Sequence, residues 1–285
     1  MTTVKVAALQ LGPACARLPE TLAATGRMLD DTAGQGAAIA LLPEMFAWPY
    51  FCADDPERWR ETAQPPSGEI SAWAAEVARA TRMVLLVPIF LRESDSQRSN
   101  AVLLARPEGE VCVAARKIHF PSRGDEPFGE EDHFQPGKPV IVIHEAAGLR
   151  FAVLICYDRR FPECWRAARA GGADLICVPV AGPANEPADF FAAEMRTHAK
   201  ENGVYALSAS RCGVDLVNGA RVGQNGDTLL ATPDGTLAGF RGRTDGPGVL
   251  ISDVDLNSLA DARARFRAFE QIRPVTSSSP RRTTL

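Results

Sequence analysis

The sequence predicts an α/β fold in which two mixed β-sheets pack face to face, with helices on each outer side, as a four-layer α-β-β-α sandwich. Strand-like and helix-like patterns alternate over residues 4–90 and again over residues 150–209, which indicates βαβ units with parallel strands. Hairpin patterns accompany both blocks and add antiparallel strands. Sheet-rich α/β enzymes of this length often form one body with one large core, so we expect one domain over residues 1–272 and a C-terminal tail over residues 273–285.

The first half supplies strands, two helices and one hairpin. Residues 67–80 show the clearest helical signal, since Ile70, Trp73 and Val77 recur at helical spacing and Ser67 is placed to cap the helix. The expected elements are a strand over 4–10, a helix over 19–32, a strand over 38–42, a helix over 67–80, a strand over 83–90 and a hairpin of 101–105 with 111–117.

The second half repeats this alternation and ends in a segment without periodicity. Pro162 is placed to begin a helix. We expect a hairpin of 140–144 with 150–155, a helix over 162–170, a strand over 174–180, a helix over 189–202, a strand over 204–209, a hairpin of 229–232 with 236–239 and a strand over 248–254. The Ser/Arg/Thr-rich end predicts a mobile tail or an arm on a partner subunit.

Composition and charge favour a small-molecule enzyme. The 285 residues are 46% hydrophobic, and the formal net charge is -4 without a basic stripe, so we expect no nucleic-acid partner. The start lacks the pattern of a secretory signal. The apolar runs over 151–156 and 175–180 are far shorter than the roughly 20 residues of a membrane helix. We therefore expect a cytoplasmic protein with no membrane partner.

The sequence offers no pattern for a metal or a nucleotide cofactor. The seven cysteines form no C-x-x-C pair, and no histidine lies at zinc-finger spacing. Gly34 and Gly36 lack the third glycine of a dinucleotide-binding loop, and there is no phosphate-binding loop. We expect reduced thiols, no metal and no cofactor.

Three residues with complementary chemistry follow predicted strands. Cys156 ends a buried strand, Glu44 ends another, and Lys117 ends a third. Open α/β sheets bind ligands at the carboxyl ends of their strands. A free thiol with a pKa of about 8.5 needs a base or a cation to react at neutral pH. Glu44 and Lys117 supply one each, and Lys117 with the N–H of Tyr157 is suited to stabilise an oxyanion.

These residues lie in three motifs that resemble the nitrilase, or carbon–nitrogen hydrolase, superfamily over nearly the whole chain. The motifs are Leu-Leu-Pro-Glu44-Met-Phe, Arg-Lys117-Ile-His-Phe-Pro and Ile-Cys156-Tyr-Asp-Arg-Arg-Phe-Pro-Glu163. The resemblance implies that Glu44 is the general base, that Lys117 stabilises the tetrahedral intermediate, and that Cys156 forms a thioester. It also implies a homodimer or larger homo-oligomer, joined through helices beside the nucleophile, with Trp165 and the tail as candidate contacts.

The same resemblance implies a second glutamate. In the family it precedes an aromatic-x-Pro-Gly sequence, and Glu130 lies four residues before Phe134 in Phe-Gln-Pro-Gly137. This spacing favours Glu130 over Glu131. Two later motifs depart from the family pattern, with Thr228 in place of a serine and His198 in place of an arginine. These departures affect packing more than chemistry.

The substrate is less well defined than the reaction. Arg159 and Arg160 follow the nucleophile, and their segment is similar to that of N-carbamoyl-D-amino acid hydrolases, where such arginines hold a carboxylate. We expect a small amide or N-carbamoyl amino acid whose hydrolysis releases ammonia. Aromatic residues after Glu44 leave uncharged aliphatic or aromatic amides, and ω-amides, as the alternative; these residues are Phe46, Trp48, Tyr50 and Phe51.

Three other hypotheses remain open at this point. Cys156 with His198 and Asn202 would form a thiolate–imidazolium pair of the papain kind, although the local papain signature is absent. The chain could instead hydrolyse a nitrile. A catalytically idle binding protein on the same fold is the third hypothesis, and the presence of every expected catalytic residue type disfavours it.

Overall fold

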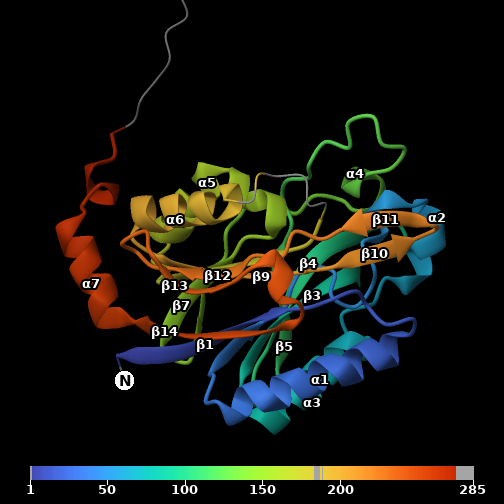
Figure 1. The fold of residues 1–285 in the computed structure, drawn as a ribbon, viewed down its shortest axis with the longest axis horizontal. Helices are drawn as coiled ribbons and strands as arrows, with labels where there is room; N and C mark the ends of the chain where they lie inside the picture. Colours follow the sequence, from blue (N-terminus) through green and yellow to red (C-terminus); the bar gives the residue numbers. More distant parts are fainter. Residues whose placement is uncertain (1, 183–186, 188, 274–285) are drawn as a thin grey trace, which may run out of the picture.

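The computed structural model describes residues 2–182, 187 and 189–273, and it contains two six-stranded sheets that face each other (Figure 1). Helices α1 (Leu18–Gly34) and α3 (Glu69–Thr81) cover the outer side of one sheet, and α5 (Pro162–Ala170) and α6 (Phe190–Asn202) cover the other. The four-layer α-β-β-α prediction is confirmed. The predicted tail, apart from Arg273, lies outside the described residues.

The first sheet has the strand order β14-β1-β2-β3-β4-β5. Its parallel centre is built from β1, β2 and β3, and antiparallel strands flank it on both sides. The bounds are β1 Thr3–Gln10, β2 Ile39–Leu41, β3 Val84–Arg92, β4 Arg98–Ala105, β5 Val111–Arg116 and β14 Gly248–Asp255. The predicted β4–β5 hairpin is present.

The second sheet has the order β13-β12-β9-β8-β7-β6 and the same plan of three parallel strands with antiparallel flanks. The bounds are β6 His144–Ala146, β7 Leu149–Val153, β8 Leu175–Val180, β9 Tyr205–Ser210, β12 Thr228–Ala231 and β13 Leu237–Arg241. The predicted strand over 140–144 is wrong except at its last residue. Val140 and Val142 are exposed rather than paired, so their apolar side chains do not indicate a buried strand there.

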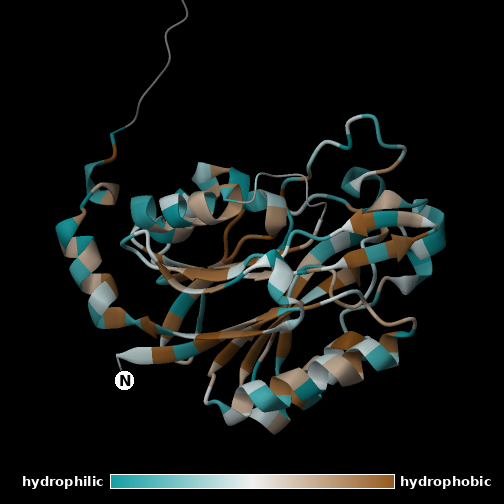
Figure 2. Ribbon diagram, viewed as in Figure 1, coloured by the Kyte–Doolittle hydropathy of each residue, from teal (hydrophilic) through white to brown (hydrophobic). Residues whose placement is uncertain are grey.

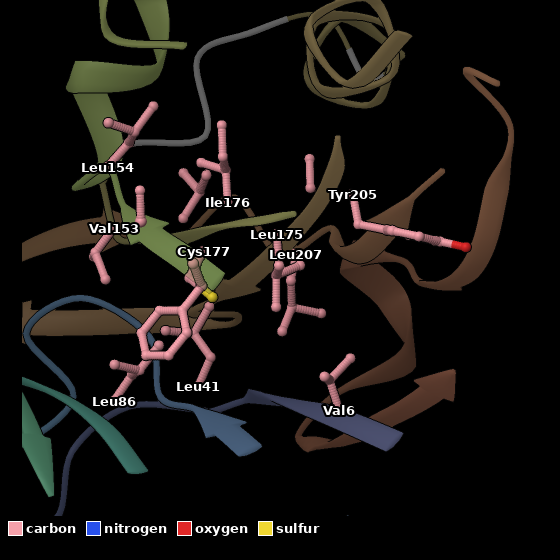
Figure 3. Close-up of a cluster of buried hydrophobic side chains, with 14 of the residues drawn as sticks. Val6, Leu41, Leu86, Val153, Leu154, Leu175, Ile176, Cys177, Tyr205 and Leu207 are labelled. Carbon is pink, nitrogen blue, oxygen red and sulfur yellow. The ribbon is translucent and has the colours of Figure 1, made fainter. Parts of the chain in front are cut away.

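The core lies between the sheets and beneath the helices. Figure 3 shows Val6, Leu41 and Leu86 of the first sheet facing side chains of β7, β8 and β9. Three strands of the parallel centres, β2, β3 and β8, are apolar along nearly their whole length, as expected for strands that are covered on both faces. Figure 2 shows the helices with one hydrophobic and one hydrophilic side, which fits their place between core and solvent.

The cap of α3 differs from the prediction. The N-cap residue is Gly68 rather than Ser67, and it has no side-chain cap. The side-chain oxygen of Gln64 accepts a hydrogen bond from the backbone N–H of Glu69 at 3.1 Å instead. Gln64, five positions before Glu69, therefore fills the capping role that the sequence pattern assigned to Ser67.

Several elements were not predicted. They are α2 (Pro56–Trp59), α4 (Glu130–His133), α7 (Leu256–Arg265) and a separate two-stranded hairpin of β10 (Val214–Val217) with β11 (Ala220–Gly223). Short 3-10 turns add η1 (Phe51–Ala53), η2 (Arg60–Thr62), η3 (Cys156–Arg160), η4 (Arg243–Asp245) and η5 (Phe269–Gln271). No helix in the described ranges is long and apolar enough to cross a membrane.

A short junction joins the two sheets at one end. Leu11, just after β1, forms a parallel bridge with Arg211, just after β9. The backbone N–H of Leu11 donates to Ser210 at 3.3 Å, and that of Cys212 donates to Leu11 at 2.8 Å. The carboxyl ends of both parallel triplets therefore meet at the same edge of the sandwich, where α/β sheets place their ligands.

Candidate active site

The predicted catalytic residues come from four different elements and meet at this edge. Glu44 follows β2, Lys117 follows β5, Cys156 follows β7, and Glu130 begins the short helix α4. The backbone of Lys117 continues the β5 pairing, since its N–H donates to the carbonyl oxygen of Asn100 at 2.8 Å. Rigid strand ends thus position three of the four side chains.

Lys117 lies between two carboxylates. Its Nζ is 2.9 Å from Oε1 of Glu44 and 2.8 Å from Oε1 of Glu130. All three side chains are at most 2% exposed. Burial strengthens such charge-assisted hydrogen bonds because water does not compete for them. The cluster holds one ammonium and two carboxyl groups, so the ammonium can neutralise only one carboxylate.

Three hydrogen-bond donors hold the Glu44 carboxylate. Lys117 and Nδ2 of Asn100, at 2.7 Å, donate to Oε1, and the backbone N–H of Ala181 donates to Oε2 at 2.9 Å. Sequence reasoning missed Asn100 and Ala181. Asn100 is the last of three polar residues that begin β4, before an apolar run, so the sequence carried no distinct signal for it.

Cys156 begins η3 with a positive φ of 47°, a conformation that non-glycine residues rarely adopt. Its Sγ lies 3.3 Å from the carbonyl oxygen of Ala181, to which the thiol donates. The backbone of Ala181 therefore contacts both Glu44, through its N–H, and Cys156, through its carbonyl oxygen. The strained turn and Ala181 together place the thiol beside the carboxylate.

Asp158 fastens this turn to the segment after β5. Its carboxylate accepts backbone hydrogen bonds from Ile155 at 3.2 Å, from Ile118 at 3.2 Å and from His119 at 2.8 Å. These donors come from both sides of the site, so one buried side chain fixes Cys156 relative to Lys117.

The pKa values follow from burial and charge. Burial alone would lower the pKa of Lys117, but the carboxylates of Glu130 and Glu44 outweigh it and raise that pKa well above its ordinary value. Burial raises the pKa of Glu130 to about 7 against the attraction of Lys117. Burial and the charge of Glu44 raise the pKa of Cys156 to about 12, although Lys117 and Arg159 oppose them. The resting site contains a thiol and an ammonium group at neutral pH.

The predicted substrate-binding residues occupy different surroundings. Tyr157 is partly buried, next to the nucleophile in η3. Arg159 is 5% exposed; its Nε is 2.8 Å from Glu194, and its Nη1 is 3.0 Å from the carbonyl oxygen of Cys156. Arg160 is 3.0 Å from the other oxygen of Glu194. Glu194 of α6 thus contacts both guanidinium groups.

The aromatic residues after Glu44 divide between core and site. Phe46 stacks on Trp73 of α3, and Phe51 packs against Trp59, so both belong to the hydrophobic core. Tyr50 reaches the site, where its hydroxyl donates to Oε1 of Glu130 at 3.3 Å. Its link to Glu130 was not predicted from the sequence.

The alternative nucleophile partner and the predicted oligomer contact lie elsewhere. The His198 ring stacks on Trp165 with centroids 4.8 Å apart, and Asn202 donates to the backbone of His198 at 2.8 Å. Neither side chain contacts Cys156 among the interactions of the described chain. Trp165 is fully buried and donates to the carbonyl oxygen of Arg159 at 2.8 Å. The expectation that Trp165 contacts a partner subunit is therefore wrong.

The chain is similar to proteins of known activity over most of its length. The chain is 28% identical to an N-carbamoylputrescine amidase of Solanum lycopersicum, covering 95% of this chain and 92% of that protein. It is 30% identical to a beta-ureidopropionase of Arabidopsis thaliana over 80% of this chain and 59% of that protein.

A solved structure shares the fold. It is an amidase mutant from Nesterenkonia sp. AN1 carrying acrylamide on its active-site cysteine, with a TM-score of 0.74 and 26% identity over 93% of this chain and 98% of that chain. The model of the family described as carbon-nitrogen hydrolase matches residues 5–264. By this match and by its fold, the chain belongs to the carbon–nitrogen hydrolase family.

Proposed function

We propose that this hydrolase cleaves the C–N bond of a small linear amide or N-carbamoyl compound through a thioester on Cys156. The observation that supports the proposal is the meeting of a thiol, a carboxylate and an ammonium group in a buried site, with Ala181 joining Glu44 to Cys156. A cysteine nucleophile needs a base within reach and a donor for the oxyanion. Glu44 and Lys117 fill these roles.

Acylation begins when the thiol loses its proton. Glu44 accepts this proton as Sγ attacks the carbonyl carbon, because the raised pKa of Cys156 leaves little thiolate at rest. Lys117 and the N–H of Tyr157 stabilise the oxyanion of the tetrahedral intermediate. Glu44 then gives its proton to the leaving nitrogen, the C–N bond breaks, and a primary amide releases ammonia. The acyl group remains bonded to Sγ as a thioester.

Deacylation uses the same base. Glu44 takes a proton from a water molecule, whose oxygen attacks the thioester carbon, and the same two donors stabilise the second oxyanion. The C–S bond breaks, and the sulfur recovers the proton from Glu44. The product is a carboxylic acid, or a carbamic acid that loses carbon dioxide when the substrate is an N-carbamoyl compound.

Glu130 acts on Lys117 rather than on the thiol. Its carboxyl group contacts Nζ of Lys117 at 2.8 Å and accepts from Tyr50. Positioning of an oxyanion donor is a large part of catalysis because misplaced dipoles must reorganise during the reaction. Glu130 therefore orients the ammonium group toward the reacting carbonyl.

Two substrate classes remain, and different observations favour them. Arg159 has Nη1 3.8 Å from the Cys156 sulfur, which supports recognition of an N-carbamoyl amino acid through its carboxylate. The Glu194 carboxylate contacts both Arg159 and Arg160, which supports an uncharged amide substrate instead. Relatives in both classes, a beta-ureidopropionase and an amidase, fit this division.

A substrate panel tests the proposal. N-carbamoyl amino acids, ω-amides, simple amides and nitriles are incubated with the enzyme, and ammonia release is measured. We expect turnover of at least one amide or carbamoyl compound, complete loss in Cys156→Ala, and normal turnover in the matched control Cys112→Ala, whose thiol is exposed and distant in sequence. Activity that survives in Cys156→Ala, or loss of activity in a folded His198→Ala, would rule out the Glu–Lys–Cys mechanism.

The arginines are tested separately. If a carboxylate is recognised, Arg159→Gln raises KM for N-carbamoyl amino acids and leaves KM for simple amides unchanged. Equal increases in KM for N-carbamoyl amino acids and for simple amides would show that Arg159 supports the structure of the nucleophile turn. That result would favour uncharged substrates.

We also propose that the enzyme is a cytoplasmic homodimer or larger homo-oligomer joined through α5 and α6. Both helices lie on the outer side of the second sheet, and all seven cysteines are free, as a reducing compartment requires. Sedimentation of the purified protein at micromolar concentration gives the oligomeric state, and a monomer would contradict this assembly.

A further inference from the structure

Asp215 is a fully buried acid in β10, outside the residues that the proposed mechanism uses. Its Oδ1 is 2.7 Å from Nη2 of Arg211, and neither side chain is exposed. Removing two charges from water is costly unless every donor and acceptor is satisfied. A buried pair of this kind calls for a structural reason.

The Asp215 carboxylate collects donors from three segments. Besides Arg211, its Oδ2 accepts from the backbone N–H of Tyr50 at 3.1 Å and from Nε2 of Gln224 at 2.7 Å. We call Arg211, Asp215 and Gln224 the brace. The brace joins the segment after β9, the β10–β11 hairpin and the chain between β2 and η1.

Two residues of the brace, Arg211 and Asp215, hold the segment that follows Glu44. Nη1 of Arg211 donates to the carbonyl oxygens of Met45, at 3.2 Å, and Trp48, at 2.6 Å. Asp215 accepts from Tyr50, whose hydroxyl reaches Glu130. Three backbone groups within six residues of Glu44 are therefore fixed by two side chains.

The third residue of the brace, Gln224, holds the segment that follows β8. Oε1 of Gln224 accepts from the backbone N–H of Gly182 at 2.9 Å. Gly182 directly follows Ala181, which contacts both Glu44 and Cys156. A shift of Gly182 would change the distance between the base and the nucleophile.

The hairpin that carries Asp215 is itself anchored at its tip. Asn218, at the turn, donates to Asp54 at 3.3 Å and accepts from Arg58 at 3.1 Å. Figure 1 shows the hairpin beside α2, apart from both large sheets. Because the hairpin pairs with neither sheet, side-chain contacts help to fix its position beyond its base.

We infer that Asp215 is a positioning residue for the hydrolysis, which holds the Glu44 and Ala181 segments in register so that Glu44 reaches the Cys156 thiol. This inference rests on the proposed function. Asp215 touches neither substrate nor reacting atoms, and it acts through Arg211, Tyr50 and Gln224.

The variant Asp215→Asn tests this role because it keeps the shape of the side chain. An amide has one acceptor oxygen and one donor NH₂ group, so at least one of the three donors loses its partner, and Arg211 loses its counter-charge. We expect the acylation rate to fall by about 10²-fold, the loss that follows a displacement of reacting groups by about 1 Å. Burst kinetics with an active amide measure this rate.

Asp174→Asn is the matched control. Asp174 is also a buried aspartate, pairs with Arg263 at 3.1 Å and accepts a backbone hydrogen bond, but it precedes β8 at the end away from Ala181. Both variants are compared at a temperature at which circular dichroism shows them folded. We expect Asp174→Asn to keep the wild-type acylation rate. Equal losses in the two variants, or a normal rate in Asp215→Asn, would overturn the inference.

Gln224→Leu provides a second comparison. If Gln224 and Asp215 act as one unit, the double variant is no slower than Asp215→Asn alone. If the fold-losses of the acylation rate in the two single variants multiply in the double variant, the two side chains act separately. That result would contradict their action as one unit.

A further readout needs no substrate and separates this inference from the proposed function. Alkylation of Cys156 by iodoacetamide is followed by peptide mass spectrometry across a range of pH. We expect the pH profile of Asp215→Asn to move to lower pH, since a loosened site admits water to the thiol, while Asp174→Asn keeps the wild-type profile. An unshifted profile overturns the positioning role. A shifted profile without amide turnover removes the proposed function and leaves only the effect of Asp215 on the surroundings of the Cys156 thiol.

Discussion

Lys117 sits between two buried carboxyl groups, and this fact sets the charge of the site. Its ammonium group compensates one carboxylate, while burial raises the pKa of Glu130 to about 7. Near neutral pH, Glu130 is therefore the group that gains or loses a proton most easily. The charge balance of the site depends on pH within the range in which most enzymes work.

Removing the ammonium group should destabilise the fold. Lys117→Met leaves Glu44 and Glu130 buried together without a cation, and breaking a buried ion pair on one side costs about 3–5 kcal/mol. Chemical denaturation measures this loss, with the exposed Lys138→Met as the control. Adding Glu130→Gln to Lys117→Met should restore part of the stability, and a double variant as unstable as the single one would contradict this account.

Glu130 should also impose a pH dependence on stability. Because its pKa is raised in the folded protein, Glu130 binds its proton more tightly there than in the unfolded chain. Its contribution is fully present below the ordinary glutamate pKa of about 4.3 and is lost as pH rises through about 7. Relative to Glu130→Gln, the wild type should lose stability between these values. Parallel curves of melting temperature against pH would contradict this.

The Cys156 thiol should react slowly with alkylating reagents in the absence of substrate. Burial and Glu44 raise its pKa to about 12, so the thiolate fraction at neutral pH is small. We expect iodoacetamide labelling of the Cys156 peptide to accelerate steadily as pH rises from neutral toward 10. A rate that is already maximal at pH 7 would show a thiolate at rest and a different route of activation.

At the scale of elements, the turn after β7 depends on Asp158. Its carboxylate accepts from the backbone of Ile155, Ile118 and His119. Asp158→Ala leaves buried N–H groups without partners, at about 1–3 kcal/mol for each unsatisfied group. We expect a lower melting temperature and a lower kcat. A stable Asp158→Ala with unchanged kcat would show that the turn holds its shape without this side chain.

The elements with strong periodicity were predictable, and those without it were not. The helix over 162–170 was predicted with the bounds of α5, and the buried strands β3, β8 and β9 were predicted within two residues. The β10–β11 hairpin was missed although Asn218-Gly219 is a strong hairpin signal; Asn218 and Gly219 both have positive φ. The helix α7 also carried a signal, since Asp255 caps it by accepting from Asn257.

The candidate site residues were predictable where a reactive side chain follows an apolar strand. Glu44, Lys117 and Cys156 are chemical exceptions at the ends of apolar runs, which is why the sequence indicates them. The backbone contacts of Ala181 and the roles of Tyr50 and Asp215 have no such signal. They arise only when two sheets and a hairpin, distant in sequence, meet in space.

At the scale of the whole molecule, the layer between the two sheets is one of the large apolar cores that stabilise the fold. Leu86 of β3 is fully buried there, whereas Leu216 of β10 is 66% exposed. Leu86→Ala should cost about 2–5 kcal/mol through lost burial and a residual cavity. Leu216→Ala changes the same side chain at the surface and should leave the free energy of unfolding nearly unchanged. Equal effects by urea denaturation would contradict the inter-sheet core.

The repeated β–α–β–α–β plan divides the reactive groups between two halves of the chain. Glu44 follows β2, the middle strand of the first parallel triplet, and Ala181 follows β8, the middle strand of the second; they join through one hydrogen bond. The carboxylate proposed as the base and the ammonium group belong to the first half, and the thiol belongs to the second. Each half alone lacks part of the proposed catalytic set, so by this mechanism a nascent chain cannot form the thioester before both halves have docked. Catalytic competence thus reports on the completion of folding.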